Sequence, residues 1–212
     1  GSSVGVSEST VVRFAIELGF SGYPSLQKSL QELIKNKLTT VQRLDLSNDY
    51  ICNGYTLKGV LKADMENIRA TMEKINYSTF EDVVNNIFEA KRIYIVGLRS
   101  SMALAEFLGF YLNVILQNVK TVGYGISDIF EEMINVGEGD LVIGIGFPRY
   151  ANRTIDVLSF AQDRGATVVA LTDSIVSPLA QRADYALIAQ SNMASFVDSL
   201  VAPLSVINAL II

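Results

Sequence analysis

From residue 91 onward, short β-branched apolar runs alternate with longer segments of helical periodicity. Five strands are predicted, at 92–97, 120–122, 140–145, 167–171 and 185–188. Helices are predicted between them, at 101–116, 128–134 and 152–164. Strands that alternate with helices are typical of βαβ units, so the pattern indicates an α/β fold with a five-stranded parallel sheet flanked by helices.

Residues 1–45 show only helical patterning. A helix from Ser7 to Leu18 is expected to pack one face inward, and Gly19 suits its left-handed end; the apolar face comprises Val11, Phe14, Ala15 and Leu18. A second helix is expected to begin near Pro24, a residue tolerated in a first turn. Its apolar stripe would be Leu26, Leu30, Leu33 and Ile34.

The segment between these two regions has little sustained periodicity. Residues 39–58 are interpreted as a linker, and helices are expected at about 59–75 and 79–90. The expected organisation is therefore a small all-α domain at 1–45, a linker and connecting helix at 46–78, and an α/β domain at 79–212.

Composition narrows the environment of the protein. The apolar runs are too short or too interrupted to span a bilayer, and nothing at the start of the chain resembles a signal peptide. The only cysteine is Cys52, so no internal disulfide can form. We therefore expect a cytoplasmic protein with no membrane partner.

The net charge of −5 is unevenly distributed along the chain. Residues 1–45 carry five Lys/Arg against four acids, whereas the remainder carries eighteen acids against twelve bases. A protein that coats nucleic acid along its whole surface is disfavoured, but the near-neutral N-terminal region permits DNA contact.

Candidate chemistry lies in three loops at the carboxyl edge of the expected sheet, where open parallel sheets bind ligands. Their hydroxyls, backbone N–H groups and guanidiniums favour a phosphate, another anion or a polyol. The first loop supplies Arg99, Ser100 and Ser101, the third supplies Gly146, Arg149, Tyr150, Arg153 and Thr154, and the fourth supplies Thr172, Asp173 and Ser177.

Each loop also has a structural interpretation. Ser100 could serve only as a helix cap. Arg149 and Arg153 could be solvated or paired with Asp156. In the fourth loop, Asp173 and Ser177 could organise a turn and cap a helix entered at Pro178.

Two sequence patterns together resemble a known family. The order GLRSS, TIDVLSFAQDRGATVVALTD and SPLAQRAD is similar to SIS domains, the sugar-isomerase fold that binds phosphosugars. Upstream, GVSESTVVRFAIELGFSGYPSLQKSL resembles the recognition helix and following helix of RpiR-type regulators. The resemblance implies a three-layer α/β/α SIS domain joined to a helix-turn-helix remnant. It also implies a bacterial regulator of carbohydrate metabolism that senses a sugar phosphate or related acidic sugar.

The resemblance assigns partners and contacts to the N-terminal region. DNA would be read through the major groove, and the protein would form a homodimer or tetramer. Because the chain begins at the turn before the recognition helix and ends inside an apolar helical run, we expect a truncated segment that binds DNA poorly. The candidate DNA contacts are Ser7, Glu8, Ser9, Thr10 and Arg13.

The same resemblance assigns Ser100, Ser101 and the loop after the third strand to a sugar-phosphate site. Members with an F-P-R-Y core often carry a serine on each side of it, whereas this chain has Gly146 and Ala151. Either the arginines have taken over anion binding, or the ligand is not a standard sugar phosphate.

Two other functions remain open. An isomerase needs a general base, and the chain has no histidine, although Glu106, Glu131 or Glu132 could act as one. The N-terminal region favours a regulator, so we expect no enzyme, and no pattern indicates a metal or a nucleotide cofactor. A SIS domain that serves only for dimerisation is the third alternative.

Overall fold

The structure, a computed structural model, describes residues 8–27, 30, 56–123, 128–192 and 197–212. The chain divides into two compact units, Gly1–Asp49 and Tyr50–Ile212. Within the part described, no helix combines the length and hydropathy required to cross a membrane.

The first unit contains helix α1 (Glu8–Glu17) and a helical segment at 23–27. Gly19 ends α1 in the left-handed conformation, with φ 86°, as predicted. Ala15 is buried, but Phe14 and Leu18 are 56% and 53% exposed, so the expectation that this face packs inward is wrong for these two residues.

The second predicted helix is only partly within the described residues. Leu26 is buried as expected, whereas Leu30 is 48% exposed. Leu33, Ile34, Cys52 and the linker at 39–55 lie outside the described residues.

The second unit is built on a five-stranded parallel sheet with strand order β2-β1-β3-β4-β5. This confirms the predicted strands and their direction. Their bounds are β1 (Ile93–Gly97), β2 (Val119–Val122), β3 (Leu141–Ile145), β4 (Thr167–Thr172) and β5 (Tyr185–Ile188).

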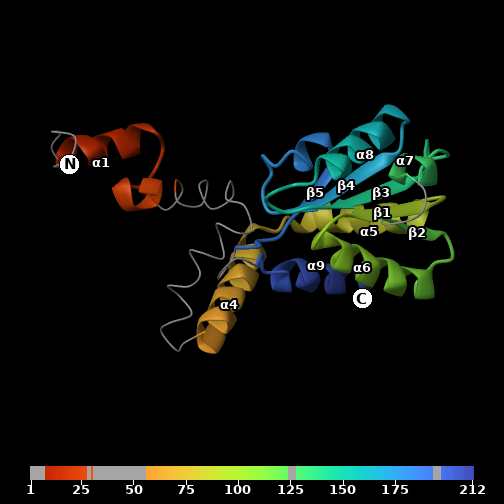
Figure 1. Cartoon of the computed structure of the whole chain (residues 1–212), viewed down its shortest axis with the longest axis horizontal. Coiled ribbons are helices and arrows are strands. Elements are labelled where there is room, and N and C mark those ends of the chain that lie inside the picture. The colour runs from red at the N-terminus through yellow and green to blue at the C-terminus, as the bar shows by residue number, and fades with distance from the viewer. Residues whose placement is uncertain (1–7, 28–29, 31–55, 124–127, 193–196) are drawn as a thin grey trace. The chain divides into compact units, whose positions relative to one another are not determined.

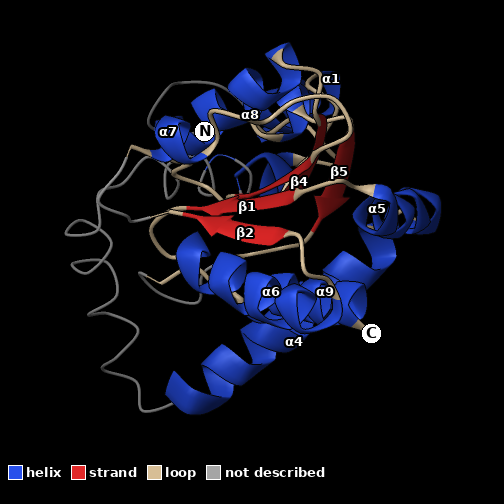
Figure 2. Ribbon diagram, turned by 90° about the vertical axis from the view of Figure 1, so that its right-hand side faces the viewer, coloured by secondary structure: helices blue, strands red, loops and turns tan. Residues whose placement is uncertain are grey.

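Helices cover both faces of the sheet, which gives the three layers visible in Figure 2. Ile93 and Ile95 point into the core shared with α5 (Tyr77–Glu89), α6 (Ser101–Ile115) and α9 (Val201–Ile211). Tyr94 and Val96 point into the core shared with α7 (Ile129–Glu132) and α8 (Asn152–Asp163). Burial on both faces explains why the strands read as continuous apolar runs.

Helix α4 (Thr56–Lys74) packs against α9 in this unit (Figure 1). Residues 56–58, which were expected to belong to the linker, form its first turn. A helix expected to begin at Pro178 is instead the single 3-10 turn Ala180–Arg182. Asp184 accepts a hydrogen bond from the Val168 backbone N–H at the start of β4, and β5 follows at Tyr185. This leaves no room for a longer helix.

Candidate functional site

The strand order places a topological switch point between β1 and β3. In the sheet, β2 lies on one side of β1, whereas β3 lies on the other side of β1 and is followed by β4. Ligands in open α/β sheets bind at such a point, outside the carboxyl ends of the strands. The loops after β1 and β3 therefore meet where a ligand site is expected.

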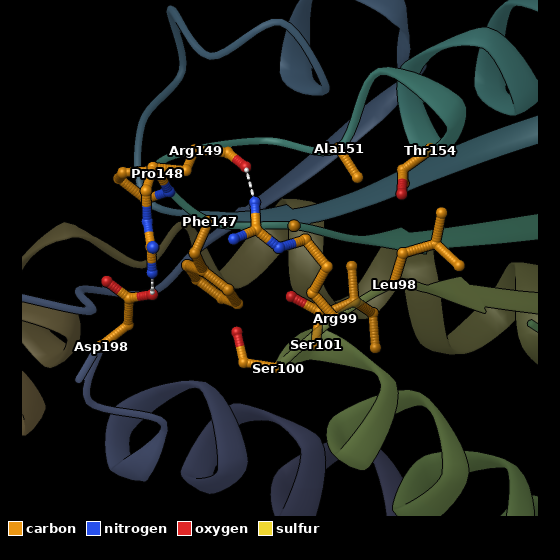
Figure 3. A pocket seen from close by; sticks show the side chains of 12 residues that line it. Leu98, Arg99, Ser100, Ser101, Phe147, Pro148, Arg149, Ala151, Thr154 and Asp198 are labelled. Carbon is orange, nitrogen blue, oxygen red and sulfur yellow. Dashed lines mark hydrogen bonds and ion pairs between the residues drawn. The ribbon is translucent and has the colours of Figure 1, made fainter. Parts of the chain in front are cut away.

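A small cavity of about 20 Å³ lies at this position (Figure 3). It brings together residues from the first and third predicted loops and one residue that precedes α9. The lining residues are Leu98, Arg99, Ser100, Ser101, Ile145, Gly146, Phe147, Pro148, Arg149, Ala151, Thr154 and Asp198.

Two helices begin at the cavity. Ser100 and Ala151 are the N-cap residues of α6 and α8, and neither side chain makes a capping hydrogen bond in this structure. The Ser100 hydroxyl therefore does not cap the helix in this structure. Thr154 is buried in the first turn of α8. Helix N-termini carry partial positive charge and directed N–H groups, so this arrangement suits an anion.

The two arginines of the cavity have unusual backbone conformations. Arg99 and Arg149 lie in the left-handed region, with φ 60° and 70°. Non-glycine residues rarely adopt this conformation, and such residues cluster at functional sites. Arg99 Nη1 donates a hydrogen bond to the carbonyl oxygen of Arg149 at 3.4 Å, which links the two loops.

Arg149 also pairs with a residue that sequence reasoning missed. Its Nη2 atom lies 3.0 Å from Asp198 Oδ2, and the Asp198 side chain is 8% exposed (Figure 3). Asp198 lies between β5 and α9. A signal existed, because the loop after β5 reaches the same edge of the sheet as the three loops that were selected.

Arg153 is not among the residues that line the cavity. Its Nη2 atom lies 3.2 Å from Asp128 Oδ2 at the exposed start of α7. The structural alternative proposed Asp156 as the partner of these arginines, but the ion pairs of the structure join Arg153 to Asp128 and Arg149 to Asp198.

The remaining predicted site residues form a separate hydrogen-bonded group. Tyr150 Oη donates to Asp173 Oδ1 at 2.6 Å, and Thr172 Oγ1 donates to Ser177 Oγ at 3.1 Å. Ser177 Oγ in turn accepts from the backbone N–H of Ala180 at 3.0 Å. Burial first, and the hydrogen bond to Asp173 second, raise the pKa of Tyr150 well above its ordinary value. The bond from the Ala180 N–H to Ser177 matches the cap expected in the fourth loop, whereas Asp173 contacts Tyr150.

The three glutamates considered as a catalytic base lie elsewhere. Glu106 is exposed on α6. Glu131 accepts a hydrogen bond from the backbone N–H of Asp128 in the capping box of α7, and Glu132 pairs with Lys120 at 3.3 Å. None of the three lines the cavity.

Three of the five predicted DNA contacts have described side chains. Ser9, Thr10 and Arg13 are exposed on α1. Glu8 is the first residue of α1, and Ser7 lies outside the described residues.

Known proteins share this architecture. A sequence model of the SIS domain matches residues 86–212. The sugar-isomerase domain of the RpiR transcription factor from Sphaerobacter thermophilus is 32% identical, with a TM-score of 0.71. The alignment covers 74% of this chain and 88% of that one. The chain belongs to the RpiR family of SIS-domain proteins. The Vibrio vulnificus NanR protein complexed with ManNAc-6P shares the fold of this RpiR-family chain, with a TM-score of 0.64 at 20% identity, over 99% of this chain and 75% of that one.

The curated relatives of this RpiR-family chain include HTH-type transcriptional regulators and bifunctional glk proteins. An uncharacterized HTH-type transcriptional regulator of Haemophilus influenzae is 29% identical over 188 residues, which are 86% of this chain and 64% of that protein. The bifunctional protein glk of Burkholderia thailandensis is 28% identical over 189 residues, which are 86% of this chain but 28% of that protein. The chain thus spans less than two thirds of either relative.

Proposed function

We propose that this chain is part of a bacterial transcription regulator of carbohydrate metabolism that senses a sugar phosphate or related acidic sugar. The observation that carries the proposal is convergence on one cavity at the sheet switch point. The start of α6, the start of α8 and the guanidinium of Arg149 all meet there. The naming of relatives as HTH-type regulators supports the regulatory part of the proposal. Such a regulator would act in the cytoplasm, where bacterial DNA lies.

The proposed site divides the effector into a charged and a neutral part. Arg149 would pair with the phosphate or carboxylate group, in place of the serines that Gly146 and Ala151 do not supply. The hydroxyls of Ser100, Ser101 and Thr154 would bind the remaining oxygens. A protein of the same fold in complex with ManNAc-6P supports a sugar phosphate as the class of effector.

Several of the sequence-predicted residues would support the effector site and would not bind the effector themselves. Arg99 would hold the loop that carries Arg149, because it donates a hydrogen bond to that residue's carbonyl. We propose a supporting role for four further residues, whose described contacts shape the neighbouring loops: Tyr150, Thr172, Asp173 and Ser177. Arg153 does not line the cavity and would attract the anionic effector only through its positive charge.

The N-terminal unit would read DNA through α1. Its exposed Ser9, Thr10 and Arg13, together with Ser7 and Glu8, would contact the major groove. In the proposed mechanism two SIS domains pair, and the effector changes the spacing of the two DNA-reading units. The effector must therefore bind one arrangement more tightly than the other.

The SIS domain would act as a sensor and not as an isomerase. The carboxylate that lines the cavity in the described structure is Asp198, and it is paired with Arg149. The three glutamates that could serve as a base lie outside the cavity. Turnover of a hexose or pentose phosphate by the purified chain would contradict this part of the proposal.

A thermal-shift screen tests the proposal. Sugar phosphates, the parent sugars and sugar acids are compared, because a ligand that binds only the native state raises the unfolding temperature. We expect a shift with phosphorylated or acidic compounds that Arg149→Ala and Ser100→Ala both reduce. No shift with any compound would favour a SIS domain that serves only for dimerisation.

A further inference from the structure

Asp198 places a negative charge inside a cavity that is otherwise suited to an anion. Its carboxylate contacts Arg149 at 3.0 Å, and the Arg149 side chain is only 21% exposed. A carboxylate and a phosphate bind a guanidinium through the same kind of charge-assisted hydrogen bond. Asp198 therefore occupies a position on Arg149 for which an anionic ligand would compete.

The small size of the cavity also indicates that an anionic ligand would compete with Asp198. A cavity needs roughly 10–15 Å³ to hold one water molecule, so the 20 Å³ present here accommodates little more than that. A phosphate group that takes the contact on Arg149 Nη2 must displace the Asp198 carboxylate that now makes it. Displacement of Asp198 would keep the charge on Arg149 compensated, because one anion would replace another.

Asp198 is connected to α4 through its sequence neighbour. Ser199 Oγ donates a hydrogen bond to Asp64 Oδ1 on α4 at 2.6 Å. Farther along α4, the buried Asn67 exchanges hydrogen bonds with the backbone of Asn192 at 2.9 and 3.2 Å. Thr71 accepts one from the backbone N–H of Gln190 at 2.8 Å. The buried side of α4 is thus held by Gln190, Asn192 and Ser199.

We propose that Asp198 is an internal competitor for the anionic effector and couples the effector site to α4. When a phosphate group binds Arg149, Asp198 is released, and Ser199 loses its hydrogen bond to Asp64. Because α4 follows the N-terminal unit along the chain, its loosening is the first step by which occupancy reaches the DNA-reading residues. This inference rests on the proposed function and names the regulation of the same site.

Calorimetric titration tests the competition. Inorganic phosphate and ManNAc-6P are titrated into the 212-residue wild type and the Asp198→Asn variant. Removal of the competing carboxylate should tighten binding by a factor typical of coupled sites, roughly 5- to 150-fold. The matched control is Glu132→Gln, which removes one negative charge from the Lys120 pair outside the cavity and should bind as the wild type does. Far-ultraviolet circular dichroism checks that each variant is folded.

The outcomes separate the two proposals. The wild type could bind a phosphate compound while Asp198→Asn binds it equally or more weakly. Asp198 would then position Arg149 and not compete with the ligand, so the further inference would fail while the proposed function stands. If neither compound binds the wild type or the variants, both proposals fail.

Hydrogen–deuterium exchange tests the coupling to α4. Saturating phosphate should increase exchange in peptides from residues 57–74 of the wild type. In Ser199→Ala, which keeps the Arg149–Asp198 pair, exchange in these peptides should be high already and unaffected by phosphate. Unchanged exchange in the wild-type α4 peptides, together with new protection at 149–154, would overturn the coupling.

Discussion

Leu179 fills the space beside Gly146. A Cβ atom at position 146 would lie 2.7 Å from Leu179 Cδ2, and Leu179 is fully buried in the core formed with α7 and α8. The glycine is therefore required by packing in this chain.

Gly146→Ser is expected to reduce stability. Overpacking of a well-filled core costs about 1–3 kcal/mol, which urea unfolding measures as a lower free energy of unfolding. Ala151→Ser is the matched control, because the N-cap position of α8 gains a hydroxyl and the variant should be as stable as the wild type or more so. Equal stability of Gly146→Ser and the wild type would contradict the packing argument.

The pair of Arg92 and Asp140 should contribute strongly to stability. Asp140 is 1% exposed, and it accepts hydrogen bonds from Arg92 Nε at 3.0 Å and Nη2 at 2.7 Å. Asp140→Ala should lower the free energy of unfolding by about 2–3 kcal/mol, less than for a fully buried pair because Arg92 is half exposed. The exposed pair of Arg69 and Glu73 is the control, since Glu73→Ala should cost about 0.5 kcal/mol or less.

Tyr150 should remain neutral where ordinary tyrosines ionise. Burial and the hydrogen bond to Asp173 raise its pKa in the folded state above the usual value of about 10. Because the folded pKa exceeds the unfolded one, the stabilisation is complete below the unfolded pKa and is lost as pH rises through the folded pKa. Spectrophotometric titration should show one fewer late-ionising tyrosine in Tyr150→Phe. An identical late phase in the variant would contradict the assignment.

Arg13 should contribute to DNA binding by the N-terminal unit. The proposed contact predicts that Arg13→Ala weakens binding to a random-sequence DNA duplex and lowers the salt-dependence slope by about 1 if Arg13 contacts a phosphate. Fluorescence anisotropy across a salt series measures both quantities. Arg69→Ala removes another exposed arginine, from α4, and should leave both unchanged. Equal effects of the two substitutions would argue against a DNA-reading role for α1.

The α/β core could be predicted because its pattern is strong. Strands buried on both faces read as unbroken apolar runs, so all five were predicted to within two residues of their observed ends. The apolar spacing of α1 predicted that Phe14 and Leu18 pack inward, but both are exposed. Spacing shows which side chains share a face of a helix, but burial depends on what covers that face.

The residues of the candidate site, unlike the strands of the sheet, could be predicted only in part. Loop order along a parallel sheet places Ser100 and Arg149 at one edge, and the structure brings them to one cavity. The direction of a side chain is decided by contacts distant in sequence, so the pairing of Arg153 with Asp128 could not be read from spacing. Asp198 could have been found if the rule applied to the other loops had been extended to the loop after β5.

The most direct test of the account is calorimetric titration of the chain with ManNAc-6P and with the same sugar lacking the phosphate. A charge-assisted hydrogen bond contributes about 1.5–3 kcal/mol, so Arg149→Ala should weaken binding of the phosphorylated sugar by roughly 10- to 150-fold. The sugar without phosphate should bind the wild type far more weakly and should be insensitive to the substitution. Equal binding of the phosphorylated sugar by the wild type and Arg149→Ala would contradict the claim that this cavity is an anion-sensing site.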